Sequence, residues 1–460
     1  MGKILSISNK NTNLMISISG IRGTIPEGLN LETIFLYSKA FAEHLNSKTA
    51  VIGLDGRPSG QFIKSILEGV LLSLGKNVID LGIVPTPTVK SVIKETRSGG
   101  GVMVSASHNP IHWNAFKLIG KNGFFYNQKE LDEFLSIAGS NPSPKPLFLP
   151  ESNVYNDSKK YIALHLESVL KWIDIGRIRK RKFKVLIDSV NAGGSIVVPA
   201  LLERLGCKVI KLNCEPTGKF ARPPEPTPKA LQVTSKKMKS SGCDIGFALD
   251  PDADRLVVLT PKKGAISEEY TLPLSILSVI EDSPKNGKIV VNLSTSFIIE
   301  EILNKYGKKL LRSKVGEANV VEMMQKERAF FGGEGNGGVI DPKISSFGRD
   351  SLSGIAHILN RLSMSREKID EIVDFLPKIY MEKTSFSSSG WEIRSLFDKF
   401  KSSFSPNTID ERDGLRMEFS SSWIHIRSSN TEPIIRVIAE TKNENDLKQI
   451  LEKAKEISEK

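Results

Sequence analysis

Apolar runs of strand length alternate with helical segments along most of the first 370 residues. Residues 50–54 form a short apolar run, and Ile63, Leu67, Val70 and Leu74 follow it at helical spacing. Alternation of this kind predicts a layered α/β architecture, in which ligands gather at the carboxyl ends of strands. Comparable strand–helix pairs occupy residues 183–187 and 197–205, and residues 288–293 and 297–306.

The chain is too long for one hydrophobic core, because domains stop growing well below its 460 residues. Four prolines between residues 139 and 150 indicate a first boundary. The alternation ends near residue 370, where a unit of mixed strands and helices begins. We therefore expect four domains, at residues 1–150, 151–255, 256–372 and 373–460.

The net charge of +12 is compatible with a nucleic acid, a small anionic ligand or a plain solvated surface. The densest basic run, residues 177–184, leads directly into an apolar strand. No zinc finger, aromatic RNA-binding box or basic zipper accompanies it. We expect no nucleic-acid partner.

A cytoplasmic location is expected from three features of the sequence. Charged and polar residues occur throughout residues 1–24, unlike a signal peptide. The sequence contains no run of 18 apolar residues, so we expect no membrane span. The three cysteines, Cys207, Cys214 and Cys243, have neither zinc-site nor redox-motif spacing, so we expect buried free thiols in a reducing compartment.

Asp250, Asp252 and Asp254 stand at alternate positions directly after a predicted strand. Carboxylates at this spacing can converge on one hard cation, and a small oxygen-only set suits Mg²⁺. An EF-hand is excluded, because its sixth and twelfth positions hold Arg255 and Pro261 here. The remaining alternative is an acidic turn without a metal.

Ser107 lies in the sequence S-A-S-H-N-P at the end of another predicted strand. An ordinary turn explains these residue types equally well. A serine hydrolase is disfavoured because no G-x-S-x-G elbow surrounds the serine. His108 and His112 do not form a helical zinc pair, since Pro110 stands between them. This motif alone decides little.

Residues 332–338, G-G-E-G-N-G-G, formally contain the dinucleotide pattern G-x-G-x-x-G. That pattern must open a helix, whereas a strand-like segment and Pro342 follow here, so we exclude dinucleotide binding. Glycines around Glu334 and Asn336 suit the close approach of a polyhydroxylated ligand. A loose loop is the alternative.

Residues 427–433, R-S-S-N-T-E-P, form a polar loop with Arg436 beyond it. Arginine binds phosphate through two parallel hydrogen bonds, and hydroxyls and loop N–H groups add further donors. The loop is a candidate phosphate site, and a plain polar hairpin is the alternative.

The four motifs, in this order, resemble those of the α-D-phosphohexomutase family along essentially the whole chain. The family patterns are S-A-S-H-N-P, D-x-D-x-D-R, G-G-E-x-[SN] and R-x-S-[GN]-T-E-P. The resemblance implies an α/β protein with three similar three-layer α/β domains, built on mixed sheets, and a smaller C-terminal α+β domain. These four domains would surround a central cleft.

The resemblance also implies an intramolecular phosphotransferase that interconverts hexose 6-phosphate and hexose 1-phosphate. Ser107 would carry the phosphoryl group and, with Asp250, Asp252 and Asp254, hold Mg²⁺. A hexose 1,6-bisphosphate would be both intermediate and activator. The residues expected to assist catalysis are Arg22, Lys117 and His108. Those expected to bind the sugar phosphate are Arg255, Glu334, Asn336, Arg427, Ser429, Asn430, Thr431 and Arg436.

This chain has Asn336 two residues after Glu334, the glutamate of the pattern G-G-E-x-[SN]. Many members of the family have serine at that position. This form favours the phosphoglucosamine mutases of the family, with the phosphomannomutase/phosphoglucomutase members as the alternative. A phosphatase using the same serine, or a sugar-phosphate sensor without activity, is disfavoured because all four motifs are complete. The small-molecule sugar phosphate is the only partner expected, and the chain would be a monomer or homodimer.

Overall fold

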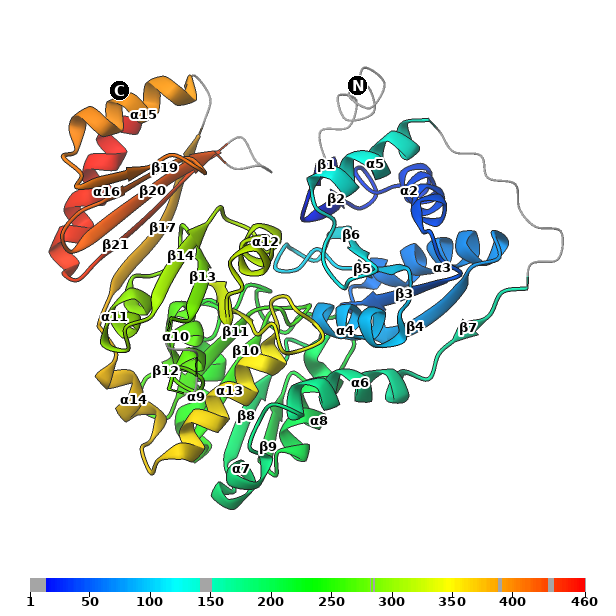
Figure 1. Cartoon of the computed structure of the whole chain (residues 1–460), viewed down its shortest axis with the longest axis horizontal. Helices are drawn as coiled ribbons and strands as arrows, with labels where there is room; N and C mark the ends of the chain where they lie inside the picture. The colour runs from blue at the N-terminus through cyan, green and yellow to red at the C-terminus, as the bar shows by residue number, and fades with distance from the viewer. Residues whose placement is uncertain are drawn as a thin grey trace.

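The computed structural model describes residues 14–140, 151–281, 283, 286–387, 391–428 and 434–459. These residues form four sheets, one in each of four successive domains (Figure 1). We call them domains I to IV in chain order. The chain passes from domain I, in blue and cyan, through the green and yellow domains II and III to the orange and red domain IV.

Domain I has a seven-stranded mixed sheet, in which the central strands are parallel and one edge is antiparallel. Its strands, in spatial order, are β1 (Leu14–Ser17), β2 (Gly20–Thr24), β6 (Trp113–Gly120), β5 (Gly100–Val104), β3 (Thr49–Leu54), β4 (Asn77–Ile83) and β7 (Val154–Tyr155). Its helices are α2 (Leu31–His44), α3 (Pro58–Ser73), α4 (Thr86–Thr96) and α5 (Gln128–Gly139).

Domain II repeats this plan with five strands, parallel from β9 to β10 and antiparallel beyond. Its strands, in spatial order, are β12 (Gly264–Ala265), β11 (Leu256–Thr260), β10 (Ile245–Leu249), β8 (Lys184–Asp188) and β9 (Lys208–Leu212). The helices are α6 (Ser158–Leu170), α7 (Ile175–Arg181), α8 (Gly194–Arg204) and α9 (Gln232–Ser240).

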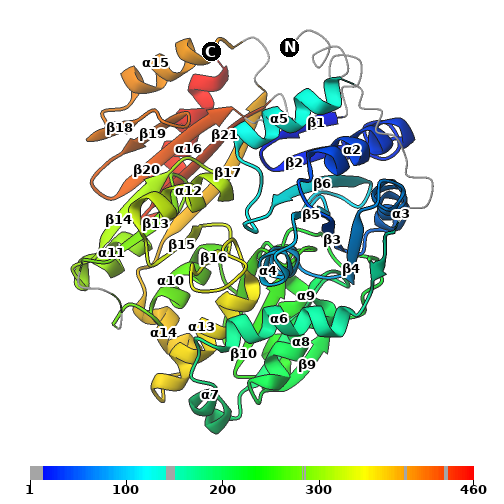
Figure 2. The same cartoon turned by 45° about the vertical axis from the view of Figure 1, so that its right-hand side comes forward.

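Domain III has four strands, again parallel with one antiparallel edge. They are, in spatial order, β14 (Lys309–Ser313), β13 (Lys288–Asn292), β15 (Phe331–Glu334) and β16 (Gly338–Ile340). Its helices are α10 (Thr271–Ile276), α11 (Ile298–Lys305), α12 (Glu317–Glu327), α13 (Ser351–Met364) and α14 (Ile369–Phe375). In Figure 2, β15 and β16 of domain III and α4 of domain I are all seen near the centre of the view.

Domain IV is wholly antiparallel, and its helices lie on one side of the sheet (Figure 1). Its strands, in spatial order, are β17 (Tyr380–Ser387), β21 (Ile434–Thr441), β20 (Ser422–Ser428), β19 (Leu415–Glu418) and β18 (Thr408–Asp410). The helices are α15 (Ile393–Ser403) and α16 (Glu444–Glu459). The expected fold class, three similar α/β domains with mixed sheets and a smaller α+β domain, is confirmed.

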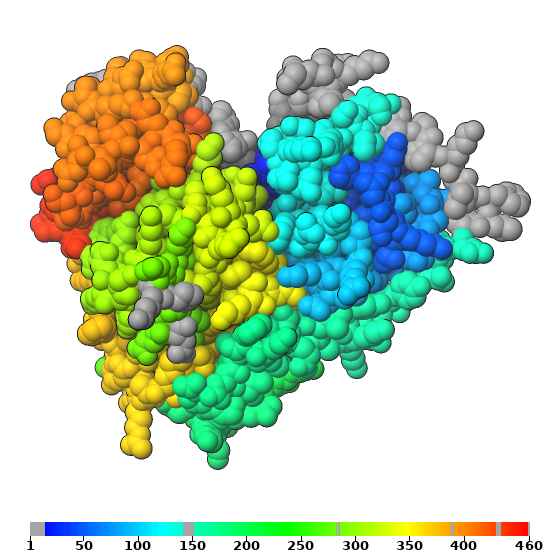
Figure 3. Space-filling view, viewed as in Figure 1, coloured from blue at the N-terminus to red at the C-terminus, as the bar shows by residue number. Residues whose placement is uncertain are grey.

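The hydrophobic core is continuous through domains I, II and III, but domain IV has its own. One cluster joins Val51 of β3, Phe247 of β10 and Phe331 of β15. Phe400 and Ile424 belong to a separate cluster within domain IV. Domain IV therefore packs as an independent unit. Figure 3 shows the surface hollowed at the top, between domain IV and the cyan part of domain I.

Polar contacts join domain IV to domain III. The Glu440 carboxylate accepts hydrogen bonds from the Ser296 hydroxyl, the Trp423 indole and, at 3.0 Å, the Phe297 backbone N–H. Phe297 directly precedes α11, so the carboxylate sits at the positive end of that helix. The Arg416 guanidinium reaches the Leu293 carbonyl in the same interface.

Two local sequence patterns predict a structure that differs from the observed one. Thr86 followed by Pro87 is typical of a helix N-cap, but the cap of α4 is Pro85 and the Thr86 hydroxyl donates to Asp252 instead. Residues 329–331 have strand character, but β15 begins at Phe331 and continues through both glycines. Each glycine there is packed too tightly for a side chain, against Met324 and Leu272.

In the part of the chain that the structure describes, no helix combines the length and the apolar character needed to cross a membrane. All three cysteines are free thiols, of which only Cys243 is buried.

Gly218 brings domain II into contact with domain I. Its φ is +66°, and a Cβ there would overlap the Gly56 carbonyl. Gly56 precedes Arg57, whose guanidinium donates to the Ser107 carbonyl in residues 105–110, which we call the serine loop. Gly82 has the same φ of +66°, but a Cβ there meets open space. A comparison of substitutions at the two glycines therefore distinguishes the cost of the left-handed backbone, which both share, from the cost of the close contact between domains, which only Gly218 makes.

We predict that Gly218→Ala lowers the stability of the protein more than Gly82→Ala does. Both variants carry the cost of a left-handed alanine, and only Gly218→Ala adds an overlap worth about 1–3 kcal/mol. The measurement is the midpoint of the first urea unfolding transition of both variants. Equal midpoints would show that the domains accommodate the added methyl group.

Candidate active site

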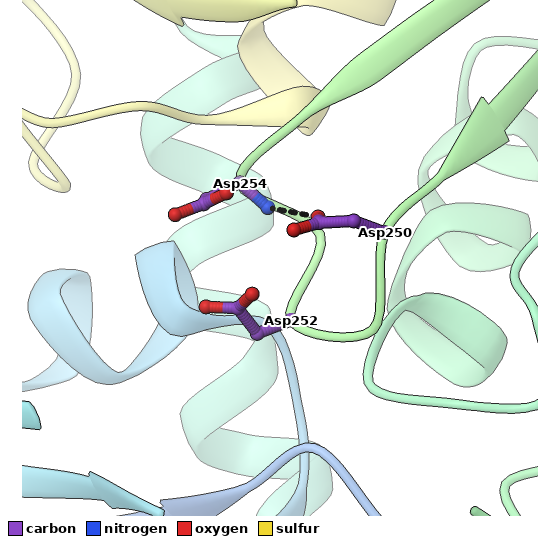
Figure 4. A group of neighbouring side chains, drawn as sticks. All are labelled: Asp250, Asp252 and Asp254. Atoms are coloured by element: carbon purple, nitrogen blue, oxygen red, sulfur yellow. Dashed lines mark hydrogen bonds between the residues drawn. The ribbon is translucent and has the colours of Figure 1, made fainter. Parts of the chain in front are cut away.

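The three aspartates lie in the turn between β10 and β11, residues 250–255, which we call the metal loop. All three are fully buried. One oxygen from each lies within 4.8 Å of the others. Ala253, in the middle of the turn, has a φ of +50°. Figure 4 shows the three side chains projecting from this one loop, with Asp250 accepting a hydrogen bond from the Asp254 N–H.

Each of two aspartates has one oxygen bound by a cation and a second oxygen that accepts no hydrogen bond. Asp252 Oδ2 accepts from the Lys117 ammonium and the Thr86 hydroxyl, and Asp254 Oδ2 accepts from Arg349 Nη2 at 2.6 Å. The Oδ1 atoms of both are buried and accept no hydrogen bond. Because such orphaned acceptors cost about 1–3 kcal/mol each, this donor set fits a divalent cation.

The aspartates differ in proton affinity. Burial raises the pKa of Asp250 well above its usual value, and the charges of Asp254 and Asp252 raise it further. Burial also opposes ionisation of Asp252, but Lys117, the Thr86 hydroxyl and the charge of Arg349 together hold its pKa below the usual range. Repulsion among the carboxylates therefore remains for a cation to relieve.

Ser107 faces this cluster. Its hydroxyl donates to Asp250 Oδ2 at 2.8 Å, and its side chain is buried. The residue follows β5 with a φ of +50°, and its N–H donates to Ser105 Oγ at 2.9 Å. Serine rarely adopts this left-handed conformation, so surrounding contacts must impose it.

Arg57 supplies those contacts. Its guanidinium donates to the carbonyls of Ser107, Asn109 (2.8 Å) and Pro110 (2.6 Å). Its Nε donates to Asp55 Oδ2 at 2.9 Å, and Asp55 also accepts from the Ser105 hydroxyl. One fully buried arginine thus fixes the backbone of the serine loop.

The residues expected to assist catalysis surround Ser107. Arg22 donates to the Asn109 side chain in the serine loop, and burial lowers its pKa to about 10. Lys117 projects from β6 onto Asp252. His108 Nδ1 lies 3.5 Å from Ser107 Oγ. Burial, assisted by the nearby charge of Arg255, lowers the pKa of His108 well below its usual value, so the ring is neutral at pH 7.

Residues 332–338, which we call the sugar loop, begin within β15 and follow it. Glu334 Oε1 accepts from Asn292 Nδ2 at 2.7 Å and from the Gly316 N–H at 3.0 Å. The Asn336 Oδ1 atom is buried without a hydrogen-bond partner. Arg255, also expected to bind substrate, pairs with Glu225 at 3.2 Å and lies 3.9 Å from Asp254.

Sequence reasoning missed Arg349, a largely buried arginine of the site. Its guanidinium contacts Asp254 of the metal loop, Glu334 of the sugar loop (3.0 Å) and Glu317 at the start of α12 (3.2 Å). Burial would lower its pKa, but these carboxylates raise the pKa well above its usual value. No local sequence pattern marks Arg349 as part of the site. Its one local feature is that it directly precedes Asp350, the N-cap of α13.

The predicted phosphate site is described only in part. Arg427 on β20 and Arg436 on β21 are directly paired neighbours in the sheet. Like charges in this register repel each other, and an anion between them would remove the repulsion. Arg427 Nη1 lies 3.4 Å from Asp413 Oδ2, and burial lowers the pKa of Arg427. The other three predictions, Ser429, Asn430 and Thr431, fall outside the described residues.

Family models of phosphoglucomutase/phosphomannomutase match four successive parts of the chain. Alpha/beta/alpha domain I matches residues 15–143, domain II residues 163–264, domain III residues 269–380 and the C-terminal domain residues 392–457.

Curated relatives match over nearly the full length. The phosphoglucomutase/phosphomannomutase of Thermococcus kodakarensis is 33% identical, with 94% of this chain and 96% of the relative covered. The phosphoglucosamine mutase of Methanocaldococcus jannaschii is 34% identical, with 92% and 94% covered.

Solved structures show the same fold. A phosphoglucomutase/phosphomannomutase family protein of Burkholderia thailandensis superposes with a TM-score of 0.82 at 24% identity, covering 96% of this chain and 97% of that one. An Aspergillus fumigatus N-acetylphosphoglucosamine mutase, solved with GlcNAc-6P and magnesium, superposes at 0.55 with 15% identity, covering 90% and 83%. The sequence matches span all four domains, and on them the chain belongs to the phosphoglucomutase/phosphomannomutase family.

Proposed function

We propose that the protein is a Mg²⁺-dependent phosphohexomutase that uses Ser107 as its phosphoryl carrier. The observation that carries the proposal is the Ser107 hydroxyl, which points at Asp250 in a buried carboxylate cluster with two orphaned oxygens. Cations from domains I and III border the same cluster. Phosphoryl transfer is catalysed mainly by such positioning and charge neutralisation.

The first half-reaction moves the phosphoryl group from Ser107 to the free hydroxyl of a hexose phosphate. The bond between Ser107 Oγ and phosphorus breaks as a new bond forms between phosphorus and the sugar oxygen. The proton of the sugar hydroxyl ends on Ser107 Oγ, which is released as a hydroxyl group. Arg22 is suited to relay this proton, because burial lowers its pKa to about 10. Lys117 stabilises the charge on the transferring group. The product is a hexose 1,6-bisphosphate.

The second half-reaction returns the other phosphate to Ser107 after the bisphosphate has turned around. A second phosphate site is needed to hold the end that is not reacting, and the paired Arg427 and Arg436 suit it. Glu334 accepts hydrogen bonds from the sugar hydroxyls. Added hexose 1,6-bisphosphate activates the enzyme, because it phosphorylates Ser107 and leaves as hexose phosphate.

The metal would be held by Asp250, Asp252 and Asp254 together with an oxygen of the phosphorylated serine. When bound, Mg²⁺ neutralises charge on the transferring phosphoryl group. The orphaned Oδ1 atoms of Asp252 and Asp254 support this assignment. The fungal neighbour that binds magnesium with its sugar phosphate has the same fold.

The sugar we propose is glucosamine phosphate. The buried Asn336 Oδ1 needs a donor, and an ammonium group at position 2 can only donate. Mannose and glucose phosphates are the second candidates, because a relative of nearly equal identity has the phosphoglucomutase/phosphomannomutase name.

Ser107→Ala is expected to abolish mutase turnover, by at least about 1,000-fold, because no other group can carry the phosphoryl. The measurement is coupled turnover of glucosamine 6-phosphate with a trace of the 1,6-bisphosphate. Ser59→Ala is the control, since its hydroxyl only accepts a hydrogen bond from Asn114 in the same domain. Undiminished turnover in Ser107→Ala would refute the serine's role. Release of inorganic phosphate faster than isomerisation in the wild type would identify a phosphatase.

Removal of divalent metal is expected to stop turnover, and Mg²⁺ should restore it. Asp252→Asn and Asp254→Asn should each weaken Mn²⁺ binding at least about tenfold, because each removes a charged ligand. Titration of the free Mn²⁺ electron paramagnetic resonance signal measures this affinity. Glu203→Gln, at an exposed ion pair with Lys211, is the control. Full activity in the presence of a strong chelator would contradict the assignment.

A substrate comparison tests the choice of sugar. We expect kcat/KM for glucosamine 6-phosphate to exceed the values for mannose 1-phosphate and glucose 1-phosphate. Asn336→Leu should reduce that preference by about tenfold, the usual effect of losing one hydrogen bond to a charged group. Comparable rates on mannose and glucose phosphates, unchanged in Asn336→Leu, would support the second candidate.

A further inference from the structure

One guanidinium connects the metal loop with the sugar loop. Arg349 Nη2 donates to Asp254 Oδ2 at 2.6 Å, and Nη1 donates to Glu334 Oε2 at 3.0 Å. Its Nε donates to Glu317 Oε2 at 3.2 Å, and only 11% of its side chain is exposed. Each of the three guanidinium nitrogens of Arg349 thus donates to a carboxylate from a different segment of the chain.

The contact with Asp254 has a counterpart at the neighbouring aspartate. Lys117 binds the Oδ2 atom of Asp252, and Arg349 binds the Oδ2 atom of Asp254. The Oδ1 atom of each aspartate accepts no hydrogen bond. Partners that bind one carboxylate oxygen in this way orient the other toward a metal. The two cations differ in one respect, because Arg349 alone also binds Glu334.

Packing fixes the arginine in this position. A Cβ at Gly338, in the sugar loop, would overlap the Arg349 Cδ and Cγ atoms. A Cβ at Gly348 would overlap Lys90 Nζ and Glu317 Oε1, which form a buried ion pair behind the arginine. Gly338 therefore leaves room for the Arg349 stem, and Gly348 leaves room for the ion pair of its partner Glu317. The planar fork of Arg349 sets the relative positions of the Asp254 and Glu334 carboxylates.

We propose that Arg349 is a positioning residue that couples metal binding at Asp254 to sugar-phosphate binding at Glu334. The inference rests on the proposed function for the identity of both ligands. A metal bound through Asp254 Oδ1 restrains Asp254, and through Arg349 it restrains Glu334 in the position that receives the sugar. Each ligand then tightens the binding of the other by the same factor.

The test measures binding and requires no turnover. Mn²⁺ affinity of the unphosphorylated full-length protein is determined from the free-ion paramagnetic resonance signal, without and with saturating glucosamine 6-phosphate. In the wild type we expect the sugar phosphate to tighten Mn²⁺ binding by about fivefold or more. In Arg349→Lys we expect that factor to fall to within about twofold of one, because lysine keeps the charge but lacks the planar fork.

Two further variants make the result specific. Gly338→Ala leaves Arg349 in the chain but displaces its stem, so it should lose the coupling as well. Arg361→Lys is the matched control, because Arg361 lies on α13, the helix that follows Arg349 in the chain, and pairs with Glu367 near the surface. Mn²⁺ binding by each variant shows that its metal loop is folded.

The outcomes separate the two claims. Loss of coupling in Arg349→Lys and Gly338→Ala, with coupling kept in Arg361→Lys, supports the inference. Coupling kept in Arg349→Lys, or absent in a wild type that binds both ligands, overturns the inference and leaves the proposed function standing. A wild type that binds neither Mn²⁺ nor glucosamine 6-phosphate overturns both.

Discussion

The structure depends on how it compensates three carboxyl groups buried in one turn. Carboxylates removed from water are unfavourable unless cations or hydrogen bonds surround them. Domain II supplies all three aspartates, but the side chains that hydrogen-bond to Asp252 and Asp254 come from other domains: Lys117 and Thr86 from domain I, and Arg349 from domain III. The metal loop is therefore the point at which three domains must meet. Their shared apolar core gives that meeting its rigidity. A cation added at the orphaned oxygens completes the compensation and does not disturb it.

The serine loop illustrates how rigidity serves chemistry. Ser107 has a left-handed backbone that costs of order 1–3 kcal/mol, and Arg57 holds it with bonds to several carbonyls. The conformation directs the hydroxyl at Asp250. A nucleophile must hold its position closely, since small displacements slow a reaction strongly. The close approach of Gly218 to Gly56, next to Arg57, extends this support into domain II.

The parts of the site that sequence could predict are those whose chemistry is local. Three aspartates at alternate positions, or a serine and an arginine after strands, are visible as short motifs, and strand–helix alternation indicated the layered domains. Arg349 was invisible because its partner Asp254 is 95 residues away. The cap expected at Thr86 failed for the same reason: its hydroxyl is used by Asp252, 166 residues along the chain. The glycines of the sugar loop were interpreted as room for a ligand, yet Gly335 packs against Glu269 and Gly338 against Arg349.

A reaction in which one sugar must present both of its ends to the same serine needs two phosphate sites of different mechanical character. The site around Ser107 belongs to three domains with a continuous apolar core, and moving any of them would expose that core. Arg427 and Arg436 belong to domain IV, which has a separate core and meets domain III through polar groups such as Glu440 and Arg416. Polar interfaces exchange protein partners for water at a small net cost, whereas apolar ones do not. We therefore expect domain IV to be the part that withdraws while the proposed bisphosphate turns and then closes again, with the site around Ser107 remaining fixed.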